Sequence, residues 1–243
     1  MLSILRKEIR SFLSSLIAYV VFIVFLIAIS LFMWVLPNYN VFDMGYANMD
    51  TLFSMAPWVF IFLISAITMR SFSEEKKSGT IEILTTKPLS DMQIILGKYF
   101  AGVLLVLFSL IPTLLYFYTI YKLGLPVGNI DSGATWGSYL GLLFMASCFV
   151  SIGIFSSAIT DNQIVSFIVS MFLCYVFYNV FDLFADFKML GSFDSLVASI
   201  GINSHYQSIS RGVIDSRDLL YFISFITVFI YATKTVFGSR KWQ

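Results

Sequence analysis

Long apolar runs alternate with short polar segments along the whole chain. Six runs contain the ~20 mostly apolar residues that a helix needs to cross a bilayer. They predict membrane spans at residues 16–36, 51–69, 99–121, 136–158, 164–183 and 219–237. Pro112 removes one backbone donor from the third span, so we expect a kink there. The pattern predicts an all-α integral membrane protein, folded as one domain over residues 1–243.

Residues 1–15, which precede the first span, show a different pattern. Their apolar residues recur at helical spacing, and the basic residues fall mainly elsewhere around the same helix. This pattern is typical of a short amphipathic helix on a membrane surface. A charged segment that only sets the topology is the alternative. The first apolar run is longer than that of a signal peptide, and no small-residue cleavage site follows, so we expect an uncleaved span.

The basic residues predict the orientation of the spans. With six spans, both termini and the 70–98 loop lie on one side of the membrane. That side carries Arg6, Lys7, Arg10, Arg70, Lys76, Lys77, Lys87, Lys98, Lys234, Arg240 and Lys241. The other side carries Lys122, Lys188, Arg211 and Arg217. Because cytoplasmic loops are enriched in Lys and Arg, we expect both termini and the 70–98 loop in the cytoplasm.

Composition supports the membrane assignment. The chain is 58% hydrophobic and 12% charged, whereas a soluble domain carries about 25% charged residues. Soluble enzymes are therefore excluded. The net charge of +1 gives no reason to expect nucleic acid or another polyanion as a partner. Cys148 and Cys174 both lie in apolar runs, where thiols behave as small hydrophobes, so no disulfide is expected.

The 70–98 loop is charged and rich in helix signals. Gly79 ends a run of four charged residues, and Thr80 can cap a helix over residues 81–86. Glu82 lies in the first turn of that helix, where a carboxylate suits the helix dipole. Pro88 ends the helix. We therefore expect an ordered helix at this point, not a flexible loop.

A second helix signal follows in the same loop. The sequence S-D-M-Q, from Ser90 to Gln93, is a capping box. It predicts a helix that continues into the third span. A short helix, a turn and a second capped helix suit the docking of a cytoplasmic partner. The alternative is a solvated loop whose caps are incidental.

The segment between the fifth and sixth spans, residues 184–218, is too long for a simple turn. It contains two short amphipathic stretches separated by glycines. Irregular backbone at membrane depth must be buried in protein or face a water-filled cavity. We therefore expect two short re-entrant helices on the outer side.

Few residues offer chemistry of their own. The chain contains no G-x-x-x-x-G-K-[ST] motif, so it cannot bind ATP through a P-loop. His205 is the only histidine, which excludes sites built from several histidines. Ser204, His205 and Asp194 could form a hydrolytic triad, but no nucleophile elbow is present. A structural hydrogen-bonding role for His205 is the preferred interpretation.

Three pairs of small residues lie along the fourth span, and the two members of each pair are four positions apart. They are Gly137, Gly141, Ser147, Ser151, Gly153 and Ser157. Such spacing allows close helix packing in membranes. Whether the packing partner is another span or another subunit is left open. Ionisable residues deep in the spans are almost absent, so the energy source of any transport is expected to lie elsewhere.

Two motifs in this layout resemble the membrane subunit of an ABC-2 type transporter. They are E-E-K-K-S-G-T-I-E-I-L-T-T-K-P-L-S, from Glu74 to Ser90, and H-Y-Q-S-I-S-R-G-V-I-D, from His205 to Asp215. The resemblance covers nearly the whole chain. Within the family, the chain looks most like the permease subunits associated with gliding motility.

The resemblance implies a coupling helix that sits in a groove of a separate ABC ATP-binding subunit. Its residues are Glu74, Glu75, Gly79, Thr80, Glu82, Leu84 and Pro88. The resemblance also implies an outer segment over the translocation path. The residues of that segment are His205, Tyr206, Arg211, Gly212 and Asp215. This chain would bind no cofactor, and ATP and Mg would be bound by the partner ATPase.

Family membership would also imply a working unit of two permease subunits, identical or related, and two ATPases in the bacterial inner membrane. Such a unit exports a substrate or does mechanical work. A six-span membrane enzyme with an outer-side site is one alternative. A non-transporting anchor of a motility or secretion assembly is another. The apolar spans and the outer amphipathic segment are compatible with a lipid-linked or amphipathic cargo, although no residue specifies one.

Overall fold

The computed structural model describes residues 1–85, 88–186, 197–212 and 215–239, with the backbone alone at 83–85 and 186. The described residues form helices joined by short turns and contain no β-strand. Six helical segments are long and apolar enough to cross a membrane. They are Leu16–Trp34, Asp50–Lys77, Asp91–Leu123, Ser132–Ile159, Gln163–Ala185 and Ser216–Ser239. The protein is therefore an all-α, six-span membrane protein, as the hydropathy pattern predicts.

Four of the spans are centred on single helices. These helices are α2 (Leu16–Trp34), α4 (Asp50–Thr68), α9 (Ser132–Ile159) and α14 (Ser216–Ser239). The third span consists of α7 (Asp91–Leu110), the 3₁₀ turn η1 (Ile111–Thr113) and α8 (Leu114–Leu123). The fifth span consists of α10 (Gln163–Tyr175), the π-helical turn η2 (Val176–Val180) and α11 (Phe181–Asp186).

The third span breaks at Pro112, where a kink was expected. Proline cannot donate the helical hydrogen bond, and the chain forms the 3₁₀ turn η1 at this point. The neighbouring Thr113 hydroxyl donates to the Leu110 carbonyl at 2.7 Å and lies 3.0 Å from the Tyr139 hydroxyl of α9. The break is thus fixed to another helix of the bundle.

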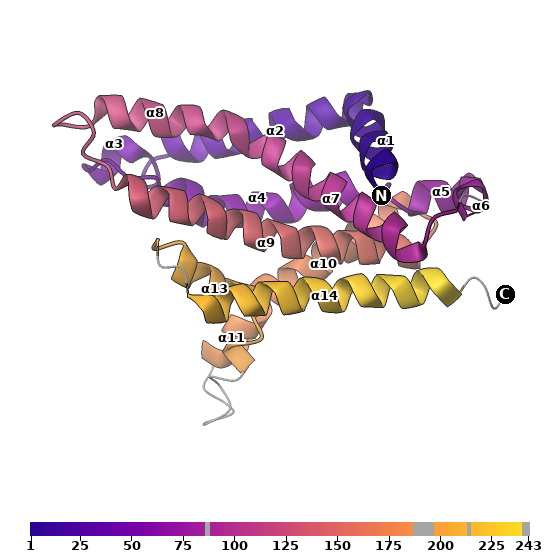
Figure 1. The fold of residues 1–243 in the computed structure, drawn as a ribbon. Coiled ribbons are helices and arrows are strands. Elements are labelled where there is room, and N and C mark those ends of the chain that lie inside the picture. Colours follow the sequence, from indigo (N-terminus) through magenta and orange to yellow (C-terminus); the bar gives the residue numbers. More distant parts are fainter. Residues whose placement is uncertain (86–87, 187–196, 213–214, 240–243) are drawn as a thin grey trace.

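Helix α9 is the centre of the bundle (Figure 1). It packs against α4, α7, α10, α14 and the short helix α13 (Ile202–Ile209). A Cβ on Gly141 would lie 2.6 Å from Ile209 Cγ2, and a Cβ on Gly153 would lie 2.0 Å from Thr68 Oγ1. These glycines let α13 and α4 approach α9 closely. The small-residue positions Gly141 and Gly153 therefore pack within this chain.

Gly137 and Gly212 make the closest contact at one end of α9. A Cβ on Gly137 would lie 2.9 Å from Gly212 Cα, and a Cβ on Gly212 would lie 2.6 Å from Ala134 Cα. Gly212 also has a φ of +82°, a conformation that residues with side chains rarely adopt. The chain after α13 therefore passes directly over α9.

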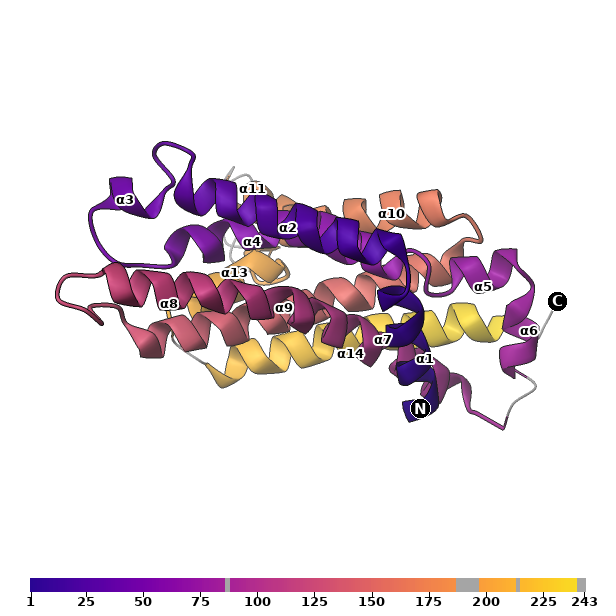
Figure 2. The same ribbon diagram turned by 90° about the horizontal axis from the view of Figure 1, so that it is seen from above.

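The two ends of the bundle carry different elements (Figures 1 and 2). Met1, the C-terminal end of α14, and the helices α1 (Leu2–Leu13), α5 (Ser73–Lys77) and α6 (Thr80–Thr85) lie at one end, which we call the terminal end. The helices α3 (Val41–Met44) and α13 lie at the opposite end, which we call the far end. Met1 and the C-terminal end of α14 thus lie on one side, as six spans require.

Helix α1 runs across the long helices rather than along them (Figure 2). Ile4 and Phe12 are buried, and Ile4 packs over Gly97 of α7, where a Cβ would lie only 3.0 Å from it. Leu2 remains 73% exposed. The amphipathic pattern therefore corresponds to a helix that packs one side against the bundle. Ile4 lies on this buried side, although the sequence pattern did not assign it to the apolar face.

The segment between the fifth and sixth spans contains α13, which corresponds to the second of the two re-entrant helices that we expected. The first was expected over residues 193–200, of which residues 193–196 lie outside the described residues. Residues 213–214 lie outside them as well. Helix α13 is held against α9, α14 and η2.

Candidate functional site

The 70–98 loop folds as two short helices and a capped start of α7. The Gln93 N–H donates to Ser90 Oγ, and the Ser90 N–H donates to Gln93 Oε1, both at 3.3 Å. The capping box is therefore confirmed. Gly79 separates α5 from α6 with a φ of +70°, in the left-handed region that favours glycine. The loop is thus a structure of defined helices, with α6 ending at Thr85 and residues 86–87 outside the described part.

The start of the loop is bonded to the end of α9. Ser157 Oγ accepts hydrogen bonds from the backbone N–H groups of Phe72, at 2.9 Å, and Ser73, at 3.1 Å, and it donates to the Met69 carbonyl at 3.1 Å. Lys76 Nζ donates to the Ala158 carbonyl. Ser157 thus supplies an acceptor for two backbone N–H groups at the start of α5, which have no partner within the helix, and it joins α5 to the central helix.

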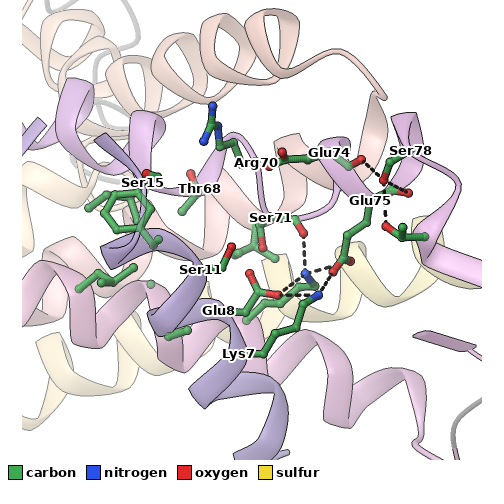
Figure 3. A pocket seen from close by; sticks show the side chains of 18 residues that line it. Lys7, Glu8, Ser11, Ser15, Thr68, Arg70, Ser71, Glu74, Glu75 and Ser78 are labelled. Carbon is green, nitrogen blue, oxygen red and sulfur yellow. Dashed lines mark hydrogen bonds and ion pairs between the residues drawn. The ribbon is translucent and has the colours of Figure 1, made fainter. Parts of the chain in front are cut away.

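Four charged side chains from three helices meet beside this joint (Figure 3). Glu75 of α5 lies 2.5 Å from Lys7 Nζ through Oε1 and 3.0 Å from Lys98 Nζ through Oε2. Glu8 Oε1 lies 2.8 Å from Lys98 Nζ and 3.6 Å from Lys7 Nζ. We call Lys7, Glu8, Glu75 and Lys98 the four-charge cluster. It links α1, α5 and α7 directly.

Lys98 is the most deeply buried member of the cluster. Its side chain is 0% exposed, and its Nζ also donates to the Ser71 carbonyl at 2.5 Å and lies 4.9 Å from the centre of the Phe72 ring. A buried charge is costly unless it is paired and hydrogen-bonded. The cluster contains two positive and two negative groups, so its charges balance. Lys98 therefore depends on α1 and α5 being in place.

Lys7 lies at the exposed edge of the cluster, and opposing effects act on the pKa of its ammonium. Partial burial lowers the pKa, while the hydrogen bond and charge of Glu75 and the charge of Glu8 raise it. The pKa lies above its ordinary value as a result. Because the folded-state pKa is raised, Lys7 contributes its stabilisation below the unfolded pKa and loses it only as the pH rises through the folded pKa. The cluster thus extends the charged state of Lys7 to a higher pH than that of a free lysine.

A cavity of about 290 Å³ lies next to the cluster, between α1, α4, the loop and α7 (Figure 3). Its polar side includes Arg70, Glu74 and Thr80, and its apolar side includes Leu105 and Ile154. The Arg70 Nε–H donates to Gln163 Oε1 at 3.3 Å, which ties this wall to α10. The loop is therefore bonded to neighbouring helices, and the cavity lies between the loop and the bundle.

The structure distributes the predicted coupling residues over two environments. Glu74, Gly79, Thr80, Glu82 and Pro88 are exposed. The Ser78 and Thr80 hydroxyls lie 2.9 Å apart across the turn before α6. Glu75 is only 8% exposed and contacts α1 and α7, so it supports the loop from inside. The side chain of Leu84 lies outside the described residues.

At the far end, His205 joins α13 to α14. Its Nδ1 lies 2.7 Å from Asp218 Oδ1, its Nε2 lies 3.0 Å from the Ser199 carbonyl oxygen, and its ring stacks on Tyr221 at 3.9 Å. The Ser204 hydroxyl instead donates to the carbonyls of Ala198 and Gly201. Ser204 and His205 therefore form no nucleophile–base pair, and Asp194 lies outside the described residues.

The remaining predicted residues of the far end are divided between core and surface. Tyr206 is buried and donates to the Phe53 carbonyl of α4 at 2.7 Å. Arg211 and Asp215 are exposed. The carboxylate of Asp215 accepts from the Arg217 N–H at 2.9 Å, at the start of α14. The second motif thus fixes α13 between α4, α9 and α14.

Lys7, Glu8 and Lys98 were not predicted as site residues from the sequence. A signal for Lys98 was nevertheless present. Ile94, Ile95 and Lys98 share one helix face by their spacing, and all three are buried. An ionisable group on an apolar face near the membrane requires a partner. No local signal identified Glu8 or Glu75 as that partner.

The fold and the 70–98 loop together define a multi-pass membrane protein in which a charged loop packs against one end of the helix bundle. The family model of the ABC-2 family transporter proteins matches residues 35–208, which is more than half of the chain. The chain belongs to the ABC-2 transporter family. No curated protein matches it. It is thus the membrane permease component of an ABC transporter, a class that works with an ATP-binding subunit.

Proposed function

We propose that this permease couples ATP hydrolysis by a separate subunit to export, or to mechanical work, across the bacterial inner membrane. In this proposal the terminal end faces the cytoplasm, and the ATP-binding subunit docks on the exposed side of α5 and α6. The excess of Lys and Arg in the terminal-end segments supports that orientation. ATP and Mg²⁺ are bound by the partner.

The four-charge cluster is the observation that carries this proposal. A force applied to α5 and α6 has two routes into the membrane part. The first runs through Glu75 to Lys98 of α7 and Lys7 of α1. The second runs through Ser157 to α9. A loop that only connected two spans would need neither route. Closure of the ATPases would therefore move α1, α7 and α9 together with the loop.

The assembly in this proposal contains two permease subunits, identical or related, and two ATPases. In this proposal the export or mechanical work serves gliding motility and its associated secretion, as the overall resemblance of the chain to gliding-motility permeases suggests. A non-transporting anchor explains the four-charge cluster less well, because an anchor does not have to transmit movement from the ATPase to the membrane helices. In this proposal helix α6, with the exposed Glu82 in its first turn, lies in the groove of the ATPase.

The test of docking is a double replacement, Glu82→Lys with Leu84→Asp, in the full-length protein. We expect the ATP-binding subunit to be lost from affinity-purified permease. Glu82→Lys reverses the charge of one side chain of the docking helix, and Leu84→Asp replaces an apolar side chain with a charged one. The permease should still insert and migrate normally in size-exclusion chromatography. Recovery of ATPase is measured by mass spectrometry of P-loop proteins in the eluate.

The matched control for this test is Asp161→Lys. Asp161 is an exposed acidic residue in the turn between α9 and α10, at the same end of the bundle. This control should retain the ATPase. Equal recovery of ATPase with the double replacement and with the control would overturn the docking proposal.

A further inference from the structure

Helix α4 contains a proline in its interior, Pro57, at which one helical hydrogen bond cannot form. Proline has no N–H group, so it cannot donate to the carbonyl four residues earlier, which is that of Phe53. At Pro112 the chain changes to the 3₁₀ turn η1, whereas α4 runs through Pro57 as one α-helix. The Phe53 carbonyl therefore needs a donor from outside α4.

The Tyr206 hydroxyl of α13 supplies that donor. It donates to the Phe53 carbonyl oxygen at 2.7 Å, across a separation of 153 residues in the chain. Both residues are buried, so water has little access to this bond. Carbonyls freed by proline in membrane helices are satisfied by neighbouring helices, and a buried carbonyl without a partner is costly. Tyr206 thus takes the place of the N–H that Pro57 lacks.

Helix α13 holds Tyr206 firmly, because α13 is bonded to α9 and α14. One residue before Tyr206, His205 Nδ1 lies 2.7 Å from Asp218 Oδ1 of α14. At the end of α13, the Ser138 hydroxyl of α9 donates to the Ser210 carbonyl at 2.7 Å. The Tyr206 bond therefore ties the start of α4 to the α9–α14 side of the bundle.

The turn around the proline of α4 lies close to irregular turns of two other spans. The Phe53 ring is 5.1 Å from the ring of Tyr139, whose hydroxyl lies 3.0 Å from that of Thr113 in η1. The ring of Trp58, the residue after the proline, is 5.5 Å from that of Tyr178 in the π turn η2. Helices bend most readily at proline and at such turns. Three spans thus have a point of weakness in the same part of the bundle.

We infer that Tyr206 is a latch on a hinge in α4. The hinge is Pro57, and the latch is the hydrogen bond from Tyr206 to Phe53. While the latch is closed, residues 50–56 of α4 are held on α13. When the bond breaks, these residues move away from α13, and the rest of α4 stays packed against α9. The inference concerns how the far end opens, and it does not depend on the docking of an ATPase.

Amide hydrogen exchange of the full-length protein in detergent, measured by mass spectrometry, tests the latch. Local opening of a helix exposes its amides without unfolding of the whole protein. Tyr206→Phe removes only the hydroxyl and leaves the Phe53 carbonyl without its donor. We expect the amides of residues 53–56 to exchange about 5- to 30-fold faster, as for the loss of one buried hydrogen bond. The amides of residues 62–68 should exchange at an unchanged rate.

A second substitution, Pro57→Ala, separates the latch from general destabilisation. Alanine restores an N–H at position 57, which can donate to the Phe53 carbonyl within α4. In this background Tyr206→Phe should accelerate the exchange of residues 53–56 by no more than about 2-fold, because the carbonyl keeps a donor. Tyr118→Phe, which changes an exposed tyrosine of α8, is the matched control and should not alter this exchange.

Three results would overturn the inference. The first is unchanged exchange of residues 53–56 in the Tyr206→Phe protein. The second is equal acceleration of residues 53–56 and 62–68, which indicates a loss of stability throughout α4 and not a local opening. The third is the same acceleration by Tyr206→Phe whether proline or alanine is at position 57. None of these measurements includes an ATPase, so the latch and the proposed docking can fail independently.

Discussion

Lys98→Met is expected to lower the unfolding free energy by about 3–5 kcal/mol, the typical cost of removing one partner from a buried ion pair. Lys98 is 0% exposed at its side chain and lies within 3.0 Å of both Glu8 and Glu75. Methionine has a similar length, so the change removes charge and hydrogen bonds with little loss of volume. Lys7 alone would then face two carboxylates. The packing of α1 and α5 on α7 should loosen as a result.

Thermal unfolding in detergent, followed by size-exclusion chromatography, measures this loss. Lys77→Met is the matched control, because Lys77 is an exposed lysine of α5 and should change the midpoint little. The double variant Lys98→Met with Glu8→Gln removes one unpaired charge and should recover part of the loss, since residues in one charge network are not additive. Equal midpoints for Lys98→Met and Lys77→Met would contradict the structural role of the cluster.

Gly153→Ala is expected to destabilise the bundle by about 1–3 kcal/mol, the usual cost of overpacking. The added Cβ would lie 2.0 Å from Thr68 Oγ1 and 2.8 Å from Thr68 Cβ. The Thr68 hydroxyl is itself fixed by donating to the Ile64 carbonyl at 2.8 Å. Because Thr68 Cβ cannot move without its helix, α4 and α9 must separate. The α5–α9 joint at Ser157 lies one turn further along α9 and should weaken with it.

The control for this packing test is Gly238→Ala in α14. No atom lies within 4 Å of a Cβ at Gly238. The substitution should therefore leave the unfolding midpoint unchanged or raise it slightly, because alanine favours the helix over glycine. Both variants are compared by thermal unfolding in the same detergent. A Gly153→Ala protein as stable as the Gly238→Ala protein would show that α4 and α9 are not closely packed at this point.

The long helices and the local caps could be predicted from the sequence, because their signals are local. Apolar length predicts the spans, Pro112 predicts the break between α7 and α8, and the S-D-M-Q box predicts the start of α7 at Ser90. In each case the residues that form the feature are neighbours in the chain. Their energies depend little on the rest of the fold.

The four-charge cluster could not be predicted in the same way. Lys7 and Glu75 are 68 residues apart, and Glu8 and Lys98 are 90 residues apart. Their pairing follows from α1 crossing α7, and this crossing depends on Ile4 fitting over Gly97. The sequence therefore showed that the loop is charged, but it did not predict that Glu75 points into the bundle toward α1 and α7.

The packing of the far end could not be predicted from the sequence either. The π turn η2 has no sequence signal comparable to a cap, and the approach of α4, α9 and α13 is set by packing between distant segments. Gly137 and Gly141 indicated close packing, but only the fold shows that Gly212 and Ile209 are the partners. Tyr178 was indistinguishable from the many other aromatic residues of the spans.

The most direct test of the central claim is photo-crosslinking from position 82 in native membranes. A photoreactive amino acid replaces Glu82 of α6 in one protein and Gln207 of α13, an exposed residue at the far end, in another. If the ATP-binding subunit docks on α6, position 82 forms a covalent adduct with a P-loop ATP-binding subunit and position 207 forms none. An ATPase adduct from position 207, or none from position 82 in a protein that inserts normally, would contradict docking on α6.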